Sequence, residues 1–132
     1  MSATIPEDLA YLLTSDVLAT VAALRPDGTI ALYLMWVDFD GTRVLTSSRV
    51  GSVKGRHWGR NPTVSLTVVD HSDPWRSLIV RGQVVGRHPD EGLAFIDKMS
   101  GRYLGVPYRM RDFPREVFEI EIDHLQAARG RA

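Results

Sequence analysis

The chain has 132 residues, of which 44% are hydrophobic and 24% charged, and its formal net charge is zero. This size and composition are typical of globular proteins, so we expect one domain over 1–132 with a frayed tail at 127–132. The lack of a net basic field disfavours a general nucleic-acid or membrane-surface binder. The absence of cysteine excludes disulfides, cysteine-bound metals and thiol nucleophiles.

Metal binding and membrane insertion are also disfavoured by the sequence. The four histidines are scattered and show no HExxH or paired spacing, so we expect no metal site. No apolar run reaches membrane-spanning length, and the N-terminus lacks a signal-peptide pattern. We therefore expect a cytoplasmic protein without a membrane partner.

The first third of the chain predicts a short helix followed by strands. Thr4 is a candidate helix cap, with Glu7 three residues later, and leucines follow at helical spacing. Three strands are predicted next, over residues 17–24, 29–39 and 42–47. The turn at Pro26-Asp27-Gly28 joins the first two strands as a hairpin, and Asp40-Gly41 turns the chain into the third.

The rest of the chain predicts two helices and three further strands. A basic helix at 50–60 ends at Asn61-Pro62, and a second helix begins near Pro89. The strands are expected at 63–69, 75–87 and 118–123. Gly82 marks a bulge or bend in the fifth strand, and the sixth alternates apolar and acidic residues. Residues 105–115 are expected to form an irregular loop.

These elements predict a mainly β fold with a few helices. Six strands that are mostly linked by hairpins, with one helix crossing between the third and fourth, favour a small closed or nearly closed antiparallel barrel. A barrel of this size rarely encloses a large cofactor by itself. A site shared between two subunits would solve that problem.

The segment 43–66 carries the strongest chemical signal in the sequence. Its strand ends in Ser47 and Ser48 and runs into a helix that carries Lys54 and Arg56. Hydroxyls, free backbone N–H groups and cations that meet at one corner predict a pocket for an anion. Two alternatives remain: the cations form a solvated helix face, and the serines cap that helix.

The order of short motifs along the chain resembles the FMN-binding split barrels of the pyridoxamine 5'-phosphate oxidase-like superfamily. The motifs are VLATV at 17–21, PDG at 26–28, LMWVD at 34–38, VKGR at 53–56, RNPTVSL at 60–66, VRGQV at 80–84 and RYLG at 102–105. Within the superfamily, the chain is most similar to actinobacterial members that use the deazaflavin coenzyme F-420 instead of FMN. The resemblance implies a six-stranded antiparallel split barrel of Greek-key type.

The resemblance also implies a homodimer with cofactor sites at its interface. Lys54, Ser47 and Ser48 would hold the cofactor phosphate, and Arg56 would assist or hold the acidic tail of a deazaflavin. Three strand residues would lie along the ring system: Leu34, Met35 and Trp36. Trp75 would reach the cofactor from the partner subunit. A purely structural role stays open for two of these residues: Trp36 also fits a core position, and Trp75 also fits an anchor of the dimer interface.

One departure from the family pattern concerns the phosphate site. Many family members carry a basic residue where this chain has Ser52, and Arg49 is a candidate to compensate for it. The loop after the helix that begins near Pro89 offers a candidate lid over the substrate through Tyr108 and Arg109. Tyr103, at the end of that helix, is better explained as helix core.

The function implied by the resemblance is hydride transfer between reduced F-420 or FMN and a small organic acceptor. In such enzymes the cofactor carries the chemistry, which agrees with a sequence that shows no triad, metal set or acid–base pair. No catalytic residue is assigned, although Tyr108 is a candidate proton donor. The alternatives are a non-enzymatic flavin or deazaflavin carrier or sensor and, less favoured, a nucleic-acid contact through the basic helix.

Overall fold

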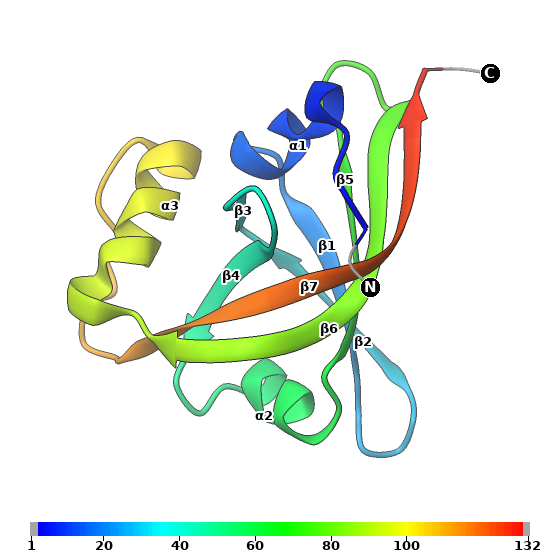
Figure 1. Ribbon diagram of the computed structural model, residues 1–132. Helices are drawn as coiled ribbons and strands as arrows, with labels where there is room; N and C mark the ends of the chain where they lie inside the picture. The colour runs from blue at the N-terminus through cyan, green and yellow to red at the C-terminus, as the bar shows by residue number, and fades with distance from the viewer. Residues whose placement is uncertain (1–2, 131–132) are drawn as a thin grey trace.

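One antiparallel sheet forms the body of the molecule, with strands in the order β2-β1-β5-β6-β7-β4-β3 (Figure 1). The computed structural model describes residues 3–130. The strands are β1 Ala19–Leu24, β2 Ile30–Met35, β3 Val37–Phe39, β4 Val44–Arg49, β5 Thr63–Val69, β6 Arg76–Pro89 and β7 Arg115–Arg129. The helices are α1 Tyr11–Thr14, α2 Val53–Arg60 and α3 Ala94–Leu104, with short 3-10 turns at Glu7–Leu9 and Glu91–Leu93.

A bend at Trp36 closes the sheet into a barrel. β2 and β3 lie at opposite ends of the strand order although only Trp36 separates them in the chain. β2 pairs with β1, whereas β3 pairs with β4. The prediction of one strand over 29–39 is therefore wrong, and the described sheet has seven strands rather than six. The backbone turns at Trp36 because its two flanking segments hydrogen-bond to different neighbours.

The predicted fold class, antiparallel pairing and Greek-key path are confirmed. The chain is mainly β, and every strand pair in the described sheet is antiparallel. After the crossing helix α2, the strands β5, β6 and β7 follow one another, and β7 returns to lie beside β4. That return is the Greek-key arrangement.

Alternation along the strands fills the barrel with apolar side chains. Phe118, Ile120 and Ile122 of β7 are fully buried, as the period-two pattern predicts. Helix α2 covers one end of the barrel, where the Trp58 ring meets Phe118 edge-on with centroids 5.0 Å apart. Each large apolar side chain buried in this way contributes about 1.5–3 kcal/mol, so the core holds the frame on which the site is built.

The helix boundaries differ from the sequence prediction at three points. Thr4 does not cap the first turn, which begins after Pro6 without a side-chain cap. Helix α2 begins at Val53 because the Ser52 hydroxyl accepts a hydrogen bond from the Gly55 N–H at 3.1 Å. Helix α3 begins only at Ala94, since Pro89 still belongs to β6. The predicted end of the basic helix at Asn61 is confirmed.

The long β6–β7 ribbon contains the predicted bulge and extends further than predicted. The pairing register shifts between Arg81 and Gly82, where a Cβ on the glycine would lie 1.8 Å from the Glu121 carbonyl oxygen. β7 continues to Arg129, which pairs with Arg76. The prediction of a tail frayed from residue 127 is therefore wrong for residues 127–129. Residues 131–132 lie outside the described part of the chain.

Helices of membrane-spanning length and apolarity are absent from residues 3–130. Within the same residues, no group of three or more metal-ligating side chains comes together.

Candidate functional site

A cavity of about 260 Å³ lies between the barrel and α3, which stands beside β3 and β4 (Figure 1). Its walls come from six parts of the chain. The lining residues are Leu34, Met35, Trp36, Ser47, Lys54, Phe95, Ile96, Met99, Tyr108 and Arg115. One wall is therefore apolar, and the other is built from hydroxyls and two cations.

The apolar wall is held in place by the aromatic side chains around the bend of the barrel. The Trp36 ring stacks on Tyr103 of α3, with centroids 5.1 Å apart and planes 13° apart. The Tyr103 hydroxyl donates to the Val17 carbonyl at 2.7 Å and accepts from the Val37 N–H at 3.3 Å. Burial raises the pKa of Tyr103. Tyr103 thus connects α3 to the barrel, which agrees with the prediction that it has a structural role rather than a role in a lid.

Helix α3 is anchored to the same part of the barrel by a buried carboxylate. Asp38 of β3 accepts from Lys98 at 2.8 Å and lies 3.0 Å from the Arg102 guanidinium. Burial raises the pKa of Asp38, but hydrogen bonds from Lys98, the Phe39 backbone and Arg102 outweigh it and hold the pKa below its ordinary value. The α3 wall of the cavity is therefore fixed by charge as well as by ring stacking.

The polar wall contains two cations, Lys54 and Arg115, and no carboxylate of residues 3–130 lies within ion-pair distance of either. Lys54 is partly buried, and its ammonium lies over the face of the Tyr33 ring, 5.2 Å from the centroid. The Arg115 Nε donates to Ser47 Oγ at 3.2 Å, and Nη1 donates to Tyr108 Oη at 3.4 Å. Within residues 3–130, neither cation forms an ion pair.

Burial and mutual repulsion both act on this pair of charges. Burial lowers the pKa of Lys54, and the positive charge of Arg115 lowers it further. Burial also lowers the pKa of Arg115, against smaller opposing effects of Tyr108 and Asp90. Partly buried charges are normally paired, so two unpaired cations facing one cavity mark a place that favours an anion.

Other arginines of the protein show the usual pattern. Each of the following lies within ion-pair distance of a carboxylate: Arg43, Arg87, Arg102, Arg111 and Arg129. Exposed arginines such as Arg56 and Arg60 also form no ion pair within residues 3–130, but water solvates their charges. Lys54 and Arg115 differ because they are partly buried and face the cavity, where a phosphate or carboxylate ligand would complement their charge.

Five of the eight residues predicted for the site line the cavity together. They are Leu34, Met35, Trp36, Ser47 and Lys54. This grouping brings the predicted ring contacts and the predicted phosphate contacts to opposite walls of one space.

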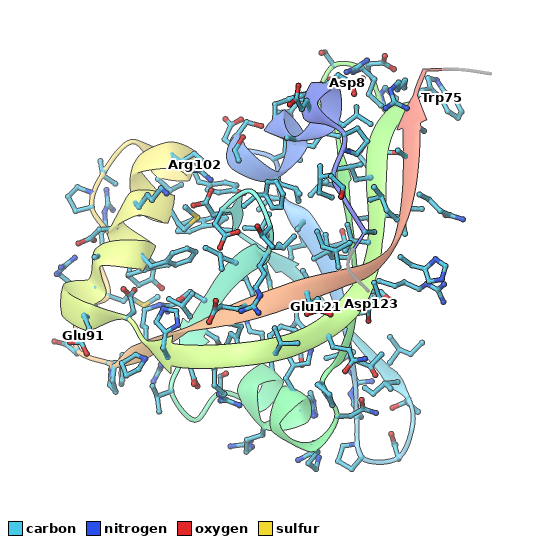
Figure 2. The ribbon with its side chains drawn as sticks, in the orientation of Figure 1. Asp8, Trp75, Glu91, Arg102, Glu121 and Asp123 are labelled. Carbon is cyan, nitrogen blue, oxygen red and sulfur yellow. The ribbon has the colours of Figure 1, made fainter. Side chains whose placement is uncertain are left out.

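Ser48, Arg56 and Trp75 do not line this cavity. Successive strand residues point to opposite faces, so Ser48 faces inward beside the core while Ser47 faces the cavity. Arg56 is exposed on α2 and donates to the Gly51 carbonyl at 3.1 Å. Trp75 is 52% exposed beside the end of β7, across the molecule from α3 (Figure 2).

The sequence prediction missed the contributions of α3 and β7. Phe95, Ile96 and Met99 come from the helix, and Arg115 opens the last strand. The helical periodicity identified Ile96 and Met99 as an apolar face, but it did not show that this face borders a cavity. Arg49, the candidate for an extra cation, instead lies 3.5 Å over the Phe113 ring.

The fold and the cavity together define a split barrel with a pocket that carries two cations on one wall. A family profile, pyridoxamine 5'-phosphate oxidase, matches residues 5–128, and the chain belongs to this family. None of the curated proteins matches the sequence significantly.

Solved structures show the same fold. An F-420 reductase is 30% identical, with a TM-score of 0.85, over 92% of this chain and 98% of that one. A conserved hypothetical protein from Mycobacterium tuberculosis is 21% identical, with a TM-score of 0.72, over 96% of this chain and 86% of that one. General stress protein 26 from Bacillus anthracis is 16% identical, with a TM-score of 0.70, over 92% of both chains.

Proposed function

We propose that this protein is an oxidoreductase that transfers hydride between a reduced deazaflavin, coenzyme F-420, or FMN and a small organic acceptor. The observation that carries the proposal is the two-walled cavity, in which unpaired Lys54 and Arg115 face apolar side chains of β2 and α3. A flat ring system with a phosphate at one end has the matching chemistry. Membership of the family and similarity to an F-420 reductase support the same class of cofactor.

In the proposed complex, the protein binds and orients the cofactor. Lys54 and Ser47 hold the phosphate, and Leu34, Met35 and Trp36 lie along the ring. When bound, the cofactor supplies the hydride chemistry. The apolar side chains of α3 exclude water from the ring, and Tyr108 brings a hydroxyl to the cavity as a candidate proton donor. Arg56 is proposed to bind the acidic tail of a deazaflavin.

A homodimer is part of the proposal because the cavity is small and open beside an apolar strand face. Its volume of about 260 Å³ is just below the usual range of ligand pockets, about 300–1,000 Å³. Leu34 at its wall is 70% exposed, and Ile30 and Leu32 continue the same face of β2 at 62% and 66%. A second copy packed on this face would cover the leucines and extend the cavity wall. Trp75 is proposed to reach the partner's cofactor.

A titration of purified protein with FMN and with F-420, followed by fluorescence, tests the proposal. We expect at least one cofactor to bind with a Kd below about 100 μM, which corresponds to roughly 5.5 kcal/mol. If neither binds below that concentration, the proposal is wrong. The reduced complex is then mixed with a panel of quinones, nitroaromatics and enones. Oxidation of the cofactor by any of these acceptors supports an enzyme, whereas a complex that stays reduced would identify a carrier or sensor instead.

A further inference from the structure

Arg115 is the charged group of the cavity that the sequence pattern did not single out. We infer that Arg115 is a second ligand for the cofactor phosphate and that it acts together with Lys54 on the same anion. This inference rests on the proposed function and adds a binding residue from the last strand. It is argued from the partners of the guanidinium, from the carboxylates around it and from the loop that holds it.

The hydrogen bonds of Arg115 leave donors available for a ligand. Its Nε donates to Ser47 Oγ at 3.2 Å, so the serine oxygen acts as acceptor and its own O–H is free to donate to an anion. One Nη1 hydrogen bond goes to Tyr108 at 3.4 Å. The remaining N–H groups have no recorded partner within residues 3–130. Arg115 and Ser47 therefore present donors from two neighbouring strands to the space that Lys54 also faces.

The nearest carboxylate in the sequence cannot neutralise Arg115. Glu116 points to the other face of β7, where it accepts two hydrogen bonds from Arg87, each 2.8 Å long. Asp90 attracts the Arg115 charge from a distance, but its two carboxylate oxygens accept the backbone N–H groups of Phe95 and Ile96. Within residues 3–130, neither carboxylate forms an ion pair with Arg115, so its guanidinium can bind an anion at the cavity.

The loop between α3 and β7 fixes the orientation of the guanidinium. The Tyr108 N–H donates to Asp97 Oδ1 at 2.9 Å, and Arg111 donates both to Asp97 and to the Tyr108 carbonyl. Tyr108 is thereby held by both of its backbone groups. Its ring lies under Arg115, 5.0 Å from the guanidinium carbon to the ring centroid. Asp97 is therefore a positioning residue, which acts on Arg115 through Tyr108.

Comparing each cofactor with its phosphate-free form tests the inference. FMN and riboflavin are titrated into the wild-type protein, Arg115→Gln and Arg129→Gln; F-420 and its deazaflavin core without phosphate form the second pair. For the cofactor that the wild type prefers, we expect Arg115→Gln to weaken binding of the phosphorylated form by roughly 10- to 100-fold. Binding of the phosphate-free form should stay unchanged. Arg129→Gln removes a positive charge from the far end of the same strand, where Arg129 pairs with Asp8, and should match the wild type.

Two further variants separate a binding role from a structural one. Arg115→Lys keeps the charge but cannot donate to Ser47 and an anion in the same geometry, so its loss should be smaller and still specific to the phosphate. Asp97→Asn should reduce the ratio of phosphorylated to phosphate-free affinity without abolishing it. This ratio is the deciding quantity, because a general loss of structure would lower both affinities together.

The outcomes distinguish this inference from the proposed function. If folded Arg115→Gln and Arg115→Lys bind the phosphorylated cofactor as well as the wild type, or lose both members of the pair equally, Arg115 is not a phosphate ligand although the proposed function stands. If Arg115→Gln does not fold, Arg115→Lys alone decides by the same ratio. If the wild type binds neither cofactor, the proposed function and the inference are both wrong.

Discussion

Replacing Lys54 with methionine should weaken cofactor binding while leaving the fold intact. Methionine keeps an unbranched side chain of similar length and removes only the charge. Among residues 3–130, the ammonium has no hydrogen bond or ion pair to lose, and it lies 5.2 Å from the centroid of the Tyr33 ring. That contact contributes about 0.5–1 kcal/mol at a partly exposed site. Relief from burial and from the charge of Arg115 offsets part of it, so the free energy of unfolding should change by less than about 1 kcal/mol.

The effect on binding should be larger than the effect on stability. A charge-assisted hydrogen bond to the cofactor phosphate contributes about 1.5–3 kcal/mol, which corresponds to roughly a 10- to 150-fold increase in Kd. Fluorescence titration measures the affinity, and urea denaturation measures the stability of the cofactor-free protein. Lys98→Met is the matched control, because Lys98 is the other lysine and donates to Asp38 at 2.8 Å. It should lower stability by about 0.5–1 kcal/mol and leave the preference for phosphorylated cofactor unchanged.

The pH dependence of binding offers an independent check on Lys54. Its pKa is lowered in the folded protein, first by burial and then by Arg115, so the ammonium loses its proton below the ordinary value of 10.5. The charged form is disfavoured by folding at neutral pH, and this penalty is relieved as the pH rises through the folded-state pKa. Cofactor affinity should therefore fall across that alkaline range in the wild type but not in Lys54→Met. Wild-type affinity in a folded Lys54→Met variant would refute the role of Lys54 in binding. A loss of more than about 2 kcal/mol of stability would instead show that the ammonium has a structural role.

Three further substitutions probe the assembly and the frame of the site. Leu32→Glu places a charge on the exposed face of β2. If the wild type is the proposed dimer, sedimentation should show a folded monomer for this variant; a dimeric variant would contradict the proposed interface. Asp38→Asn removes the carboxylate held by Lys98 and Arg102 and should lower the free energy of unfolding by about 2–3 kcal/mol near pH 7. Because the pKa of Asp38 is lowered in the folded state despite its burial, this difference should shrink as the pH falls below about 3.8, and a pH-independent difference would argue against an ionic role. Gly82→Ala brings a Cβ within 1.8 Å of a carbonyl oxygen of β7 and should lower stability by about 3 kcal/mol or more in urea denaturation, whereas a wild-type midpoint would mean that the ribbon relaxes.

Local patterns accounted for most of the strands and for part of the site. The apolar alternation at 118–123 depends only on residues two positions apart, and the Asn61-Pro62 stop acts on its own helix. The same local reasoning placed Ser47 and Lys54 near one corner. It failed where an adjacent pair was treated as one unit, because Ser47 and Ser48 point to opposite faces of β4.

The site depends on contacts that no local pattern contains. Ser47 and Arg115 are 68 positions apart and meet only because β4 pairs with β7. The apolar periodicity of α3 predicted a buried face but not its neighbour, which is set by the ion pairs at Asp38 and the stacking of Tyr103 on Trp36. Likewise, the break of the predicted 29–39 strand follows from the different partners of β2 and β3.

The sequence by itself determined the strand and helix types, the turns between them and the cationic corner around Lys54, because hydrophobic period and turn chemistry act over a few residues. The tertiary structure alone decided the bend at Trp36, the placement of α3 and the arrival of Arg115 beside Ser47. Strand pairing across long stretches of chain selects those neighbours, and the total energy of the closed barrel, rather than any one segment, determines the pairing.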